Sequence, residues 1–310
     1  MVKAFLSQLW IESNLLDLAK YIEKVVDRFD RLELHYGHGT ENSFDEAVYL
    51  VYGVLGIDYQ ISIDVANRIL TSDEFSKLDE KVEIRISQRI PVAYLLNEAW
   101  FAGIKFLSDA RALVPRSPIA ELIQNNFHSL LMNKPNSVLD LCCGGGCIGI
   151  ATAKYFESAQ VDLADFDPDA LDLALSNINL HDVESRVKVI QSDLFSAISS
   201  NYDLILCNPP YVSAQEYKSL PDEFNQEPVI GLVCEEDGLA LSVRILKEAA
   251  NYLADEGMLI MEVGYSAKLL AQRFESVPFL WLDFDQGGSG VLALSQRQLQ
   301  QFGTHQYLPS

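Results

Sequence analysis

The sequence predicts an α/β protein in which a mostly parallel sheet follows a smaller helical region. From residue 137 onward, short apolar runs that suit buried strands alternate with longer segments of helical periodicity. Strands that are separated by helices imply βαβ units and therefore parallel pairing. Before residue 115 the apolar residues recur near a period of 3.6, which indicates helices.

Length and composition are those of an ordinary globular protein with room for two domains. The chain has 310 residues, of which 49% are hydrophobic and 22% are charged. Its net charge is −21, and residues 116–310 carry 11 Lys/Arg against 26 Asp/Glu, which gives −15. Such acidity disfavours binding to nucleic acid phosphates and suits a basic protein partner, or it serves solubility alone.

The cysteines and the first residues give the expected compartment. Five cysteines, with Cys142 adjacent to Cys143, do not suggest a disulfide framework. Cys147 lies close by, but no second cysteine pair or histidine completes a metal ligand set, so we expect apolar packing and no metal. The first residues lack the pattern of a secretory leader, and no apolar stretch is long enough to span a bilayer. We therefore expect a cytoplasmic protein without a membrane partner.

The helical region is predicted to extend to residue 115. Apolar residues over 5–22 have helical spacing, the pattern 43–46 reads as a capping box for a helix over 46–55, and a further helix is expected over 71–90. A strand or hairpin pattern occupies 100–114, before the proline-rich segment 114–118. We predict a domain boundary there: 1–115 is a helical substrate-recognition domain with a connecting hairpin, and 116–310 is the second domain.

The second domain is predicted as alternating strands and helices. Strands are expected at 137–141, 160–164, 187–191, 204–207, 258–263, 280–285 and 291–295. Helices are expected at 149–156, 168–180, 238–253 and 267–275. Only the segment 286–290 separates the last two strands, which favours an antiparallel hairpin at the end of the sheet.

A glycine-rich turn follows the first strand of this domain. Glycines there allow positive φ and a close approach of the backbone to a ligand. The spacing of three of the glycines also fits the dinucleotide pattern, so a nicotinamide cofactor stays open, whereas the P-loop pattern is absent. The residues that we expect to bind a cofactor at this turn are Asp140, Cys142, Cys143, Gly144 and Gly146.

Carboxylates follow the next two strands. Asp165, after the second strand, can accept hydrogen bonds from both ribose hydroxyls of an adenosine, while the nearby Asp167 is an alternative or a helix cap. Asp193, after the third strand, can accept from an adenine amino group while Leu194 covers the ring. We also expect Phe166, the residue after Asp165, to bind the cofactor.

The tetrapeptide Asn208-Pro209-Pro210-Tyr211 follows the fourth strand. The prolines cannot donate to a sheet ladder, so they end the strand at the edge where ligands bind in open α/β sheets. The segment offers acceptors for one planar N–H₂ group and an aromatic face to stack on it. These four residues are the predicted catalytic residues of a methyl transfer to nitrogen, and Asn208 is also counted as cofactor-binding.

Taken in this order, the glycine turn, Asp165, Asp193 and the tetrapeptide resemble S-adenosylmethionine-dependent glutamine N5-methyltransferases. The resemblance is nearest to those that act on ribosomal proteins. Further segments that carry it are 37–40, 45–47, 89–95, 113–118, 227–228 and 277–290. It implies a Rossmann-like, seven-stranded class I methyltransferase sheet with an antiparallel final strand, S-adenosylmethionine as methyl donor, and a basic ribosomal protein of the large subunit as partner.

The resemblance also implies roles at the tetrapeptide. The Asn208 side-chain oxygen and the Pro209 carbonyl would each accept one hydrogen of the glutamine amide, and Tyr211 would stack on the amide plane. The family's usual turn reads D-L-C-T-G-S-G-C, whereas this chain has Cys143 for Thr and Gly145 for Ser. A hydroxyl contact to the cofactor is therefore expected to be absent or replaced by backbone.

Other functions remain open at this point. The same tetrapeptide suits glutamine methylation of peptide-chain release factors, and residues 37–57 favour the ribosomal branch instead. It also suits adenine N6 methylation of DNA, against which the acidic charge argues. A nucleotide-sensing module without turnover and an NAD-dependent oxidoreductase are the remaining alternatives.

Overall fold

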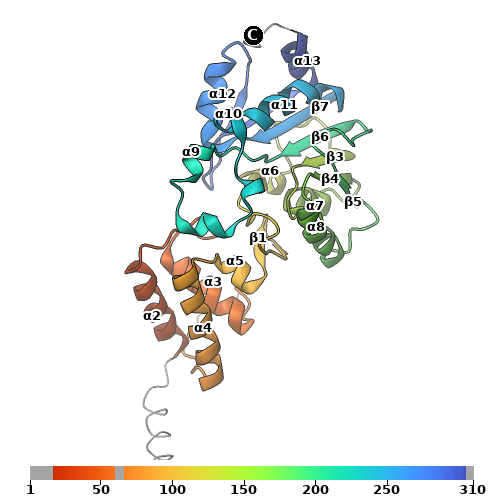
Figure 1. Cartoon of the computed structure of the whole chain (residues 1–310). Helices are drawn as coiled ribbons and strands as arrows, with labels where there is room; N and C mark the ends of the chain where they lie inside the picture. Colours follow the sequence, from red (N-terminus) through yellow and green to blue (C-terminus); the bar gives the residue numbers. More distant parts are fainter. Residues whose placement is uncertain (1–16, 60–65, 305–310) are drawn as a thin grey trace, which may run out of the picture. The chain divides into compact units, whose positions relative to one another are not determined.

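The computed structural model describes residues 17–59 and 66–304, and the chain divides into two compact units, Met1–Asn97 and Glu98–Ser310 (Figure 1). The division falls earlier than the predicted boundary at 115/116. The reason is the hairpin of β1 (Ala99–Phe101) and β2 (Ile104–Phe106), whose buried Phe101 and Phe106 belong to the core of the second unit. Residues 5–16 of the predicted N-terminal helical pattern lie outside the described residues.

The first unit is helical, as predicted. Its described helices are α2 (Leu18–Asp30), α3 (Ser43–Leu55), α4 (Ser72–Gln88) and α5 (Val92–Leu96). The cap of α3 is Asn42, whose side chain accepts from the Asp45 amide at 2.9 Å, and not the predicted Ser43. An asparagine oxygen reaches the N3 amide as well as a serine hydroxyl does, so the cap lies one residue before the proposed one and the helix begins at Ser43, three residues before its predicted start.

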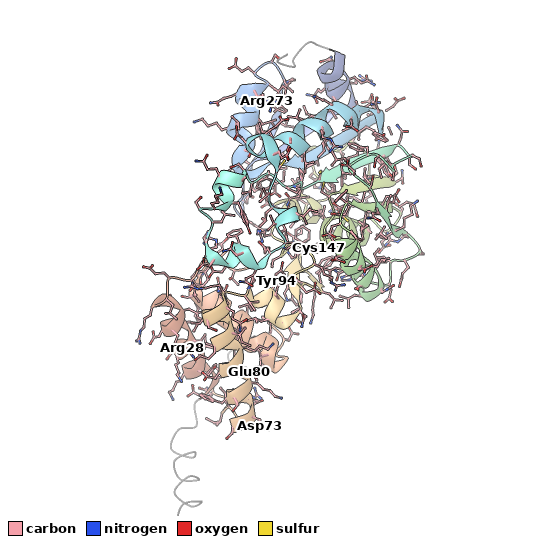
Figure 2. The ribbon with its side chains drawn as sticks, viewed as in Figure 1. Arg28, Asp73, Glu80, Tyr94, Cys147 and Arg273 are labelled. Atoms are coloured by element: carbon pink, nitrogen blue, oxygen red, sulfur yellow. The ribbon has the colours of Figure 1, made fainter. Side chains whose placement is uncertain are left out.

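Charged side chains also join the helices of the first unit. Arg28, labelled in Figure 2, extends from α2 to Asp79 at 3.2 Å and to Glu83 at 2.5 Å on α4. A buried pair, Arg85 Nε to Glu46 Oε1 at 2.7 Å, connects α4 to α3. Removing one partner of such a buried pair leaves an uncompensated charge, which makes it a strong constraint on this packing.

The second unit contains the predicted sheet of seven strands in the order β5-β4-β3-β6-β7-β9-β8. Its strands are β3 (Ser137–Leu141), β4 (Gln160–Asp165), β5 (Val187–Gln191), β6 (Tyr202–Cys207), β7 (Leu253–Glu262), β8 (Leu280–Leu282) and β9 (Val291–Ser295). The pairs from β5 through β7 are parallel, and β9 is antiparallel to both β7 and β8. The predicted fold class is confirmed.

Two hydrophobic clusters cover the two faces of this sheet. Along β3, Val138 belongs to one cluster, whereas Leu139 and Leu141 belong to the other, as the alternation of a strand requires. The first cluster contains buried residues of α6 (Ile119–Gln124), α7 (Cys147–Tyr155) and α8 (Pro168–Leu180). The second contains residues of α11 (Ala240–Glu248), α12 (Ala267–Arg273) and α13 (Gln296–Thr304). Both faces are therefore buried, which explains the continuous apolar runs of the central strands.

The predicted helix over 238–253 is wrong in its extent. The structure has the short α10 (Glu235–Gly238), then α11, and then the 3₁₀ turn η4 (Ala249–Asn251), and β7 already begins at Leu253. Positive φ angles at Glu236, Asp237 and Gly238 separate α10 from α11, and the turn into β7 ends the helix earlier than predicted. The remaining short elements are α9 (Ala214–Tyr217), η2 (Asp222–Gln226), η3 (Val229–Gly231) and η5 (Gly264–Ser266). Within 17–59 and 66–304, no helix combines the length and apolarity needed to cross a bilayer.

Candidate active site

The predicted site residues follow parallel strands at a single edge of the sheet. In register, Leu141 of β3 lies opposite Ala164 of β4 and Cys207 of β6, and Cys207 lies opposite Met261 of β7. The glycine turn, the carboxylate at the end of β4 and the tetrapeptide after β6 are therefore brought together. After β3 the chain continues to β4 on one side, while β6 lies on the other side, and such a switch point is where α/β sheets bind ligands.

The turn after β3 adopts left-handed backbone at three positions. Cys142, Gly144 and Gly146 have φ angles of 58°, 52° and 79°. A Cβ added to Gly146 would lie 2.8 Å from Leu163 Cδ1, so packing as well as the positive φ favours glycine there. The buried Cys143 donates its backbone N–H to the Ala164 carbonyl at 3.1 Å. The turn ends at Cys147, labelled in Figure 2, which is the first residue of α7.

Asp140 supports this turn from inside the protein. Its side chain is completely buried, and its Oδ2 accepts the Gly149 backbone N–H at 2.7 Å. Within the described part of the chain, Oδ1 has no hydrogen-bond partner. Burial raises the pKa of Asp140 to about 7, although the Gly149 hydrogen bond acts in the opposite direction. Oδ2 of Asp140 therefore fixes the first turn of α7, and Oδ1 can accept a further hydrogen bond.

The raised pKa of Asp140 predicts a pH-dependent stability. In the unfolded chain this carboxyl has its ordinary pKa of 3.8, below the value in the folded protein, so protonation favours folding. Its contribution is fully present below that value and is lost as the pH rises toward about 7. We expect the unfolding free energy of the wild type, relative to Asp140→Asn, to fall by about 1.4 kcal/mol per pH unit over this window. Urea unfolding of both proteins between pH 4 and 8 measures it, and parallel curves would contradict the assignment.

The carboxylate of Asp165, at the end of β4, accepts two backbone hydrogen bonds and can also bind a ligand. Its Oδ2 accepts the Gly144 N–H at 2.8 Å, and its Oδ1 accepts the Asp167 N–H at 3.0 Å. Burial raises its pKa, and these backbone hydrogen bonds lower it. Each carboxylate oxygen keeps a second lone pair for a ligand hydroxyl. Asp167 caps α8 by accepting the Asp169 N–H at 3.0 Å, which supports the capping alternative for that residue.

The other predicted cofactor residues differ in exposure. Phe166 is 62% exposed directly after Asp165. Asp193 is exposed and pairs with Arg244 at 3.1 Å, so its carboxylate is available at the surface after β5. Leu194 is buried at a positive φ of 48°, and its carbonyl accepts the Ser192 hydroxyl at 2.6 Å.

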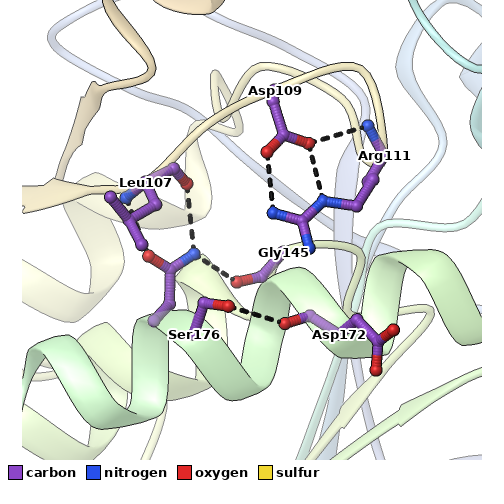
Figure 3. A network of polar contacts seen from close by, with 7 residues as sticks. Leu107, Asp109, Arg111, Gly145, Asp172 and Ser176 are labelled. Carbon is purple, nitrogen blue, oxygen red and sulfur yellow. Dashed lines mark hydrogen bonds and ion pairs between the residues drawn. The ribbon is translucent and has the colours of Figure 1, made fainter.

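Asn177, which the sequence reasoning did not single out, fixes the glycine turn. This fully buried residue of α8 donates to the Gly145 carbonyl at 2.9 Å and to the Leu107 carbonyl at 3.2 Å. Its oxygen accepts the Leu107 N–H at 2.7 Å. Figure 3 shows these contacts between the turn, Leu107 and α8, with the ion pair of Asp109 and Arg111 nearby. The sequence could have indicated this role, because an asparagine in the interior of a predicted helix usually has a specific hydrogen-bond partner.

We expect Asn177→Ala to weaken the fold around the turn. The change leaves three backbone groups without their partner and should cost about 2–4 kcal/mol of unfolding free energy. The control is Ser176→Ala on the same helix, because among the described residues the Ser176 hydroxyl bonds only to the Asp172 carbonyl, one turn earlier, at 2.9 Å (Figure 3). Thermal unfolding measures both. Equal melting temperatures for the two variants would contradict the role of Asn177.

The tetrapeptide leaves β6 as predicted. Asn208 and Pro210 are half-buried and Pro209 is buried. Immediately afterwards, Val212 is connected to a second segment: its N–H donates to the Leu232 carbonyl at 2.9 Å and its carbonyl accepts from Cys234 at 2.8 Å. The tetrapeptide is therefore anchored at both ends, by the sheet before it and by this parallel bridge after it.

Tyr211 is held at both its ring and its backbone. Its hydroxyl donates to Glu262 Oε1 at 2.9 Å, and its carbonyl accepts the Ser266 hydroxyl at 3.0 Å. Two glycines allow this position, because a Cβ at Gly264 would lie 2.5 Å from the ring and a Cβ at Gly238 would lie 2.1 Å from the carbonyl oxygen. Burial, and after it the charge of Glu262, raises the pKa of the Tyr211 phenol.

A second buried carboxylate connects the beginning of the second unit to the segment after the tetrapeptide. Both oxygens of Glu227 accept from the Arg116 guanidinium, at 2.7 and 2.8 Å, and Oε1 also accepts the Val114 N–H at 2.9 Å. Glu227 is 3% exposed, so it is a structural anchor and not part of a solvated loop. Bidentate geometry of this kind fixes the relative orientation of the two segments.

Comparison with known proteins assigns the family. Residues 121–226 match the model of the methyltransferase small domain. The chain is 40% identical over 295 residues to the ribosomal protein uL3 glutamine methyltransferase of Francisella tularensis, covering 94% of each chain. It is 42% identical over 288 residues to the protein of the same name from Xylella fastidiosa, covering 92% of this chain and 91% of that one.

A methyltransferase structure from Pyrococcus furiosus is more distant, with 16% identity and a TM-score of 0.46; the match covers 73% of this chain and 99% of that one. The two bacterial relatives match almost from end to end, so the assignment does not depend on one motif. The chain is a methyltransferase, and it belongs to the family of ribosomal protein uL3 glutamine methyltransferases.

Proposed function

We propose that this enzyme transfers a methyl group from S-adenosylmethionine to the side-chain N5 nitrogen of a glutamine in ribosomal protein uL3. The observation that carries the proposal is the identity of 40% and 42% to two relatives of that name over more than nine tenths of each chain. The tetrapeptide Asn208–Tyr211 at the ligand-binding edge of the sheet supplies the chemistry that such an activity needs.

The residues at the turn fit the proposed cofactor. The left-handed glycines let the backbone approach a ligand, and the lone pairs left on Asp165 suit the two ribose hydroxyls. Asp193 would accept from the adenine amino group, and the exposed ring of Phe166, which follows Asp165, would offer an aromatic contact. The unpartnered Oδ1 of Asp140 would gain a partner from a cationic amino group. When bound, S-adenosylmethionine supplies an electrophilic sulfonium methyl group.

Asn208 and Pro209 would prepare the nucleophile. The nitrogen of a glutamine amide is a poor nucleophile because its lone pair is delocalised into the carbonyl. The Asn208 oxygen and the Pro209 carbonyl each accept one amide hydrogen, which fixes the nitrogen and stabilises the positive charge that develops on it. Pro209 and Pro210 restrict the backbone, so the acceptors are in place before the substrate arrives.

Tyr211 would complete the amide site. Its ring stacks on the amide plane, and the negative face of the ring favours nearby positive charge. The contacts of Tyr211 to Glu262, Ser266 and Gly264 leave the ring little freedom, which supports such a role. Water takes the proton that the nitrogen finally loses.

The charge of the enzyme is compatible with a basic protein substrate. Residues 116–310 have 11 Lys/Arg and 26 Asp/Glu, and the resulting −15 attracts a basic ribosomal protein and repels nucleic acid phosphates. We assign substrate selection to the helical unit of residues 1–97, since the chemistry belongs entirely to residues of the second unit.

The direct test uses labelled methyl donor and purified substrates. The enzyme is incubated with purified uL3, with purified release factor and with DNA, and the modified residue is located by mass spectrometry. We expect one methyl group on a glutamine side chain of uL3 and background label elsewhere. Label on the release factor alone would show that the proposed substrate is wrong, and label on adenine would show that the proposed reaction is wrong.

A further inference from the structure

Glu262 is a buried carboxylate at the end of an interior strand. It is 6% exposed, and it lies in register with Val291 on β9. Its two oxygens have different partners: Oε1 accepts the Tyr211 hydroxyl at 2.9 Å, and Oε2 accepts the Ser117 hydroxyl at 2.6 Å. Burying a carboxylate is costly unless its oxygens accept hydrogen bonds, and both oxygens of Glu262 do so, which holds the two hydroxyl side chains at one carboxylate.

The direction of these hydrogen bonds is defined. The Ser117 oxygen accepts the Ile119 N–H at 3.2 Å, so its own proton is free to point at Glu262. The Tyr211 phenol keeps its proton because burial and the carboxylate raise its pKa. Burial raises the pKa of Glu262 itself, while the two hydroxyls and the charge of Arg116 act against it. Both hydroxyls therefore donate to Glu262.

We propose that Glu262 is the positioning residue of the methyl transfer, fixing the ring of Tyr211 and, through it, the plane of the substrate amide. This inference rests on the proposed function. Glu262 does not need to touch the substrate, because it acts on the hydroxyl end of the ring, which also lies against Gly264. A phenol that donates to a carboxylate also carries more negative charge on its ring, which strengthens the attraction to positive charge developing on nitrogen.

A double-mutant cycle on kcat tests this. Tyr211→Phe and Glu262→Gln each weaken or remove one hydrogen bond to the ring, and each should lower kcat with uL3 about tenfold. If Glu262 acts through Tyr211, the double variant should also be about tenfold slower and not about a hundredfold slower. Multiplying effects, or an unchanged kcat in Glu262→Gln, would overturn the proposal, because a merely structural role would add to the loss of the tyrosine hydroxyl.

A milder variant keeps the test decisive if Glu262→Gln fails to fold. Ser117→Ala removes the donor to Oε2 and also the acceptor of the Ile119 N–H, but it leaves the Glu262 carboxylate in place. It should lower kcat about threefold when Tyr211 is present and not at all together with Tyr211→Phe. An equal loss in both backgrounds would overturn the proposal. Calorimetry with S-adenosylmethionine checks that each variant is folded. Absence of methyl transfer to uL3 by the wild-type enzyme would instead mean that the proposed function itself is wrong.

Discussion

Replacing Asn208 by alanine should abolish most of the turnover and leave the fold intact. The variant loses the side-chain oxygen that accepts one amide hydrogen, so the nitrogen is no longer held for attack. Loss of one preorganised polar contact to a transition state lowers kcat about 10²–10³-fold. Because Asn208 is half-buried after β6 and the prolines that follow define the backbone, stability should change by about 1 kcal/mol or less.

The measurement is steady-state methylation of uL3 together with calorimetric titration of S-adenosylmethionine. We expect kcat to fall while the dissociation constant of the cofactor changes less than about threefold. Asn179→Ala, the same substitution at an exposed position of α8, is the control and should behave as wild type. An unchanged kcat in Asn208→Ala would remove the tetrapeptide from the chemistry.

Gly238→Ala should have the second large effect, through the backbone of the tetrapeptide. Gly238 has a φ of 87°, and a Cβ there would lie 2.1 Å from the Tyr211 carbonyl oxygen. Since backbone atoms cannot move aside like a flexible side chain, Tyr211 must shift. A displacement of about 1 Å in a catalytic group can lower the rate about 10²-fold.

Gly287→Ala separates this clash from backbone strain. Gly287 has a φ of 86°, nearly the same as Gly238, but a Cβ there meets nothing within 4 Å. Both variants should lose about 1–2 kcal/mol from the left-handed conformation. Only Gly238→Ala should also lose kcat. If the two variants lose activity equally, the contact with Tyr211 is not the cause of the lower kcat.

The sequence predicted the sheet well because its strands are short apolar runs between clear breaks. β3, β5 and β9 have the predicted bounds, and α8 begins and ends as expected from the proline at its first position and its leucines. The predicted helix over 238–253 was too long at both ends, because Gly238 has a positive φ against the Tyr211 carbonyl and because the chain leaves α11 through η4 to begin β7 at Leu253, and no local pattern reports either feature. For the same reason the hairpin 99–106 was assigned to the wrong unit: its phenylalanines find their partners far along the chain.

At the site, the sequence located residues that follow strands and missed those that support them. Asp165 and Asn208 come directly after apolar runs, so their place at the sheet edge could be predicted. Asn177, Ser117 and Glu262 act across separations of 32 to 145 residues, and their partners are defined only by the fold. The glutamate that ends β7 still offered a signal, since a charge at the end of an apolar strand needs a partner.

The place of β9 between β7 and β8 has a consequence for the order in which the protein forms. Glu262 pairs in register with Val291, and the Val263 N–H donates to the Gly290 carbonyl at 2.7 Å. The environment that buries this carboxylate is thus completed by the last strand of the sheet. During synthesis from the N-terminus, the turn and the tetrapeptide emerge long before the segment 290–295 that closes the sheet beside them. The enzyme therefore gains a fully supported Tyr211 only after its final strand has been inserted.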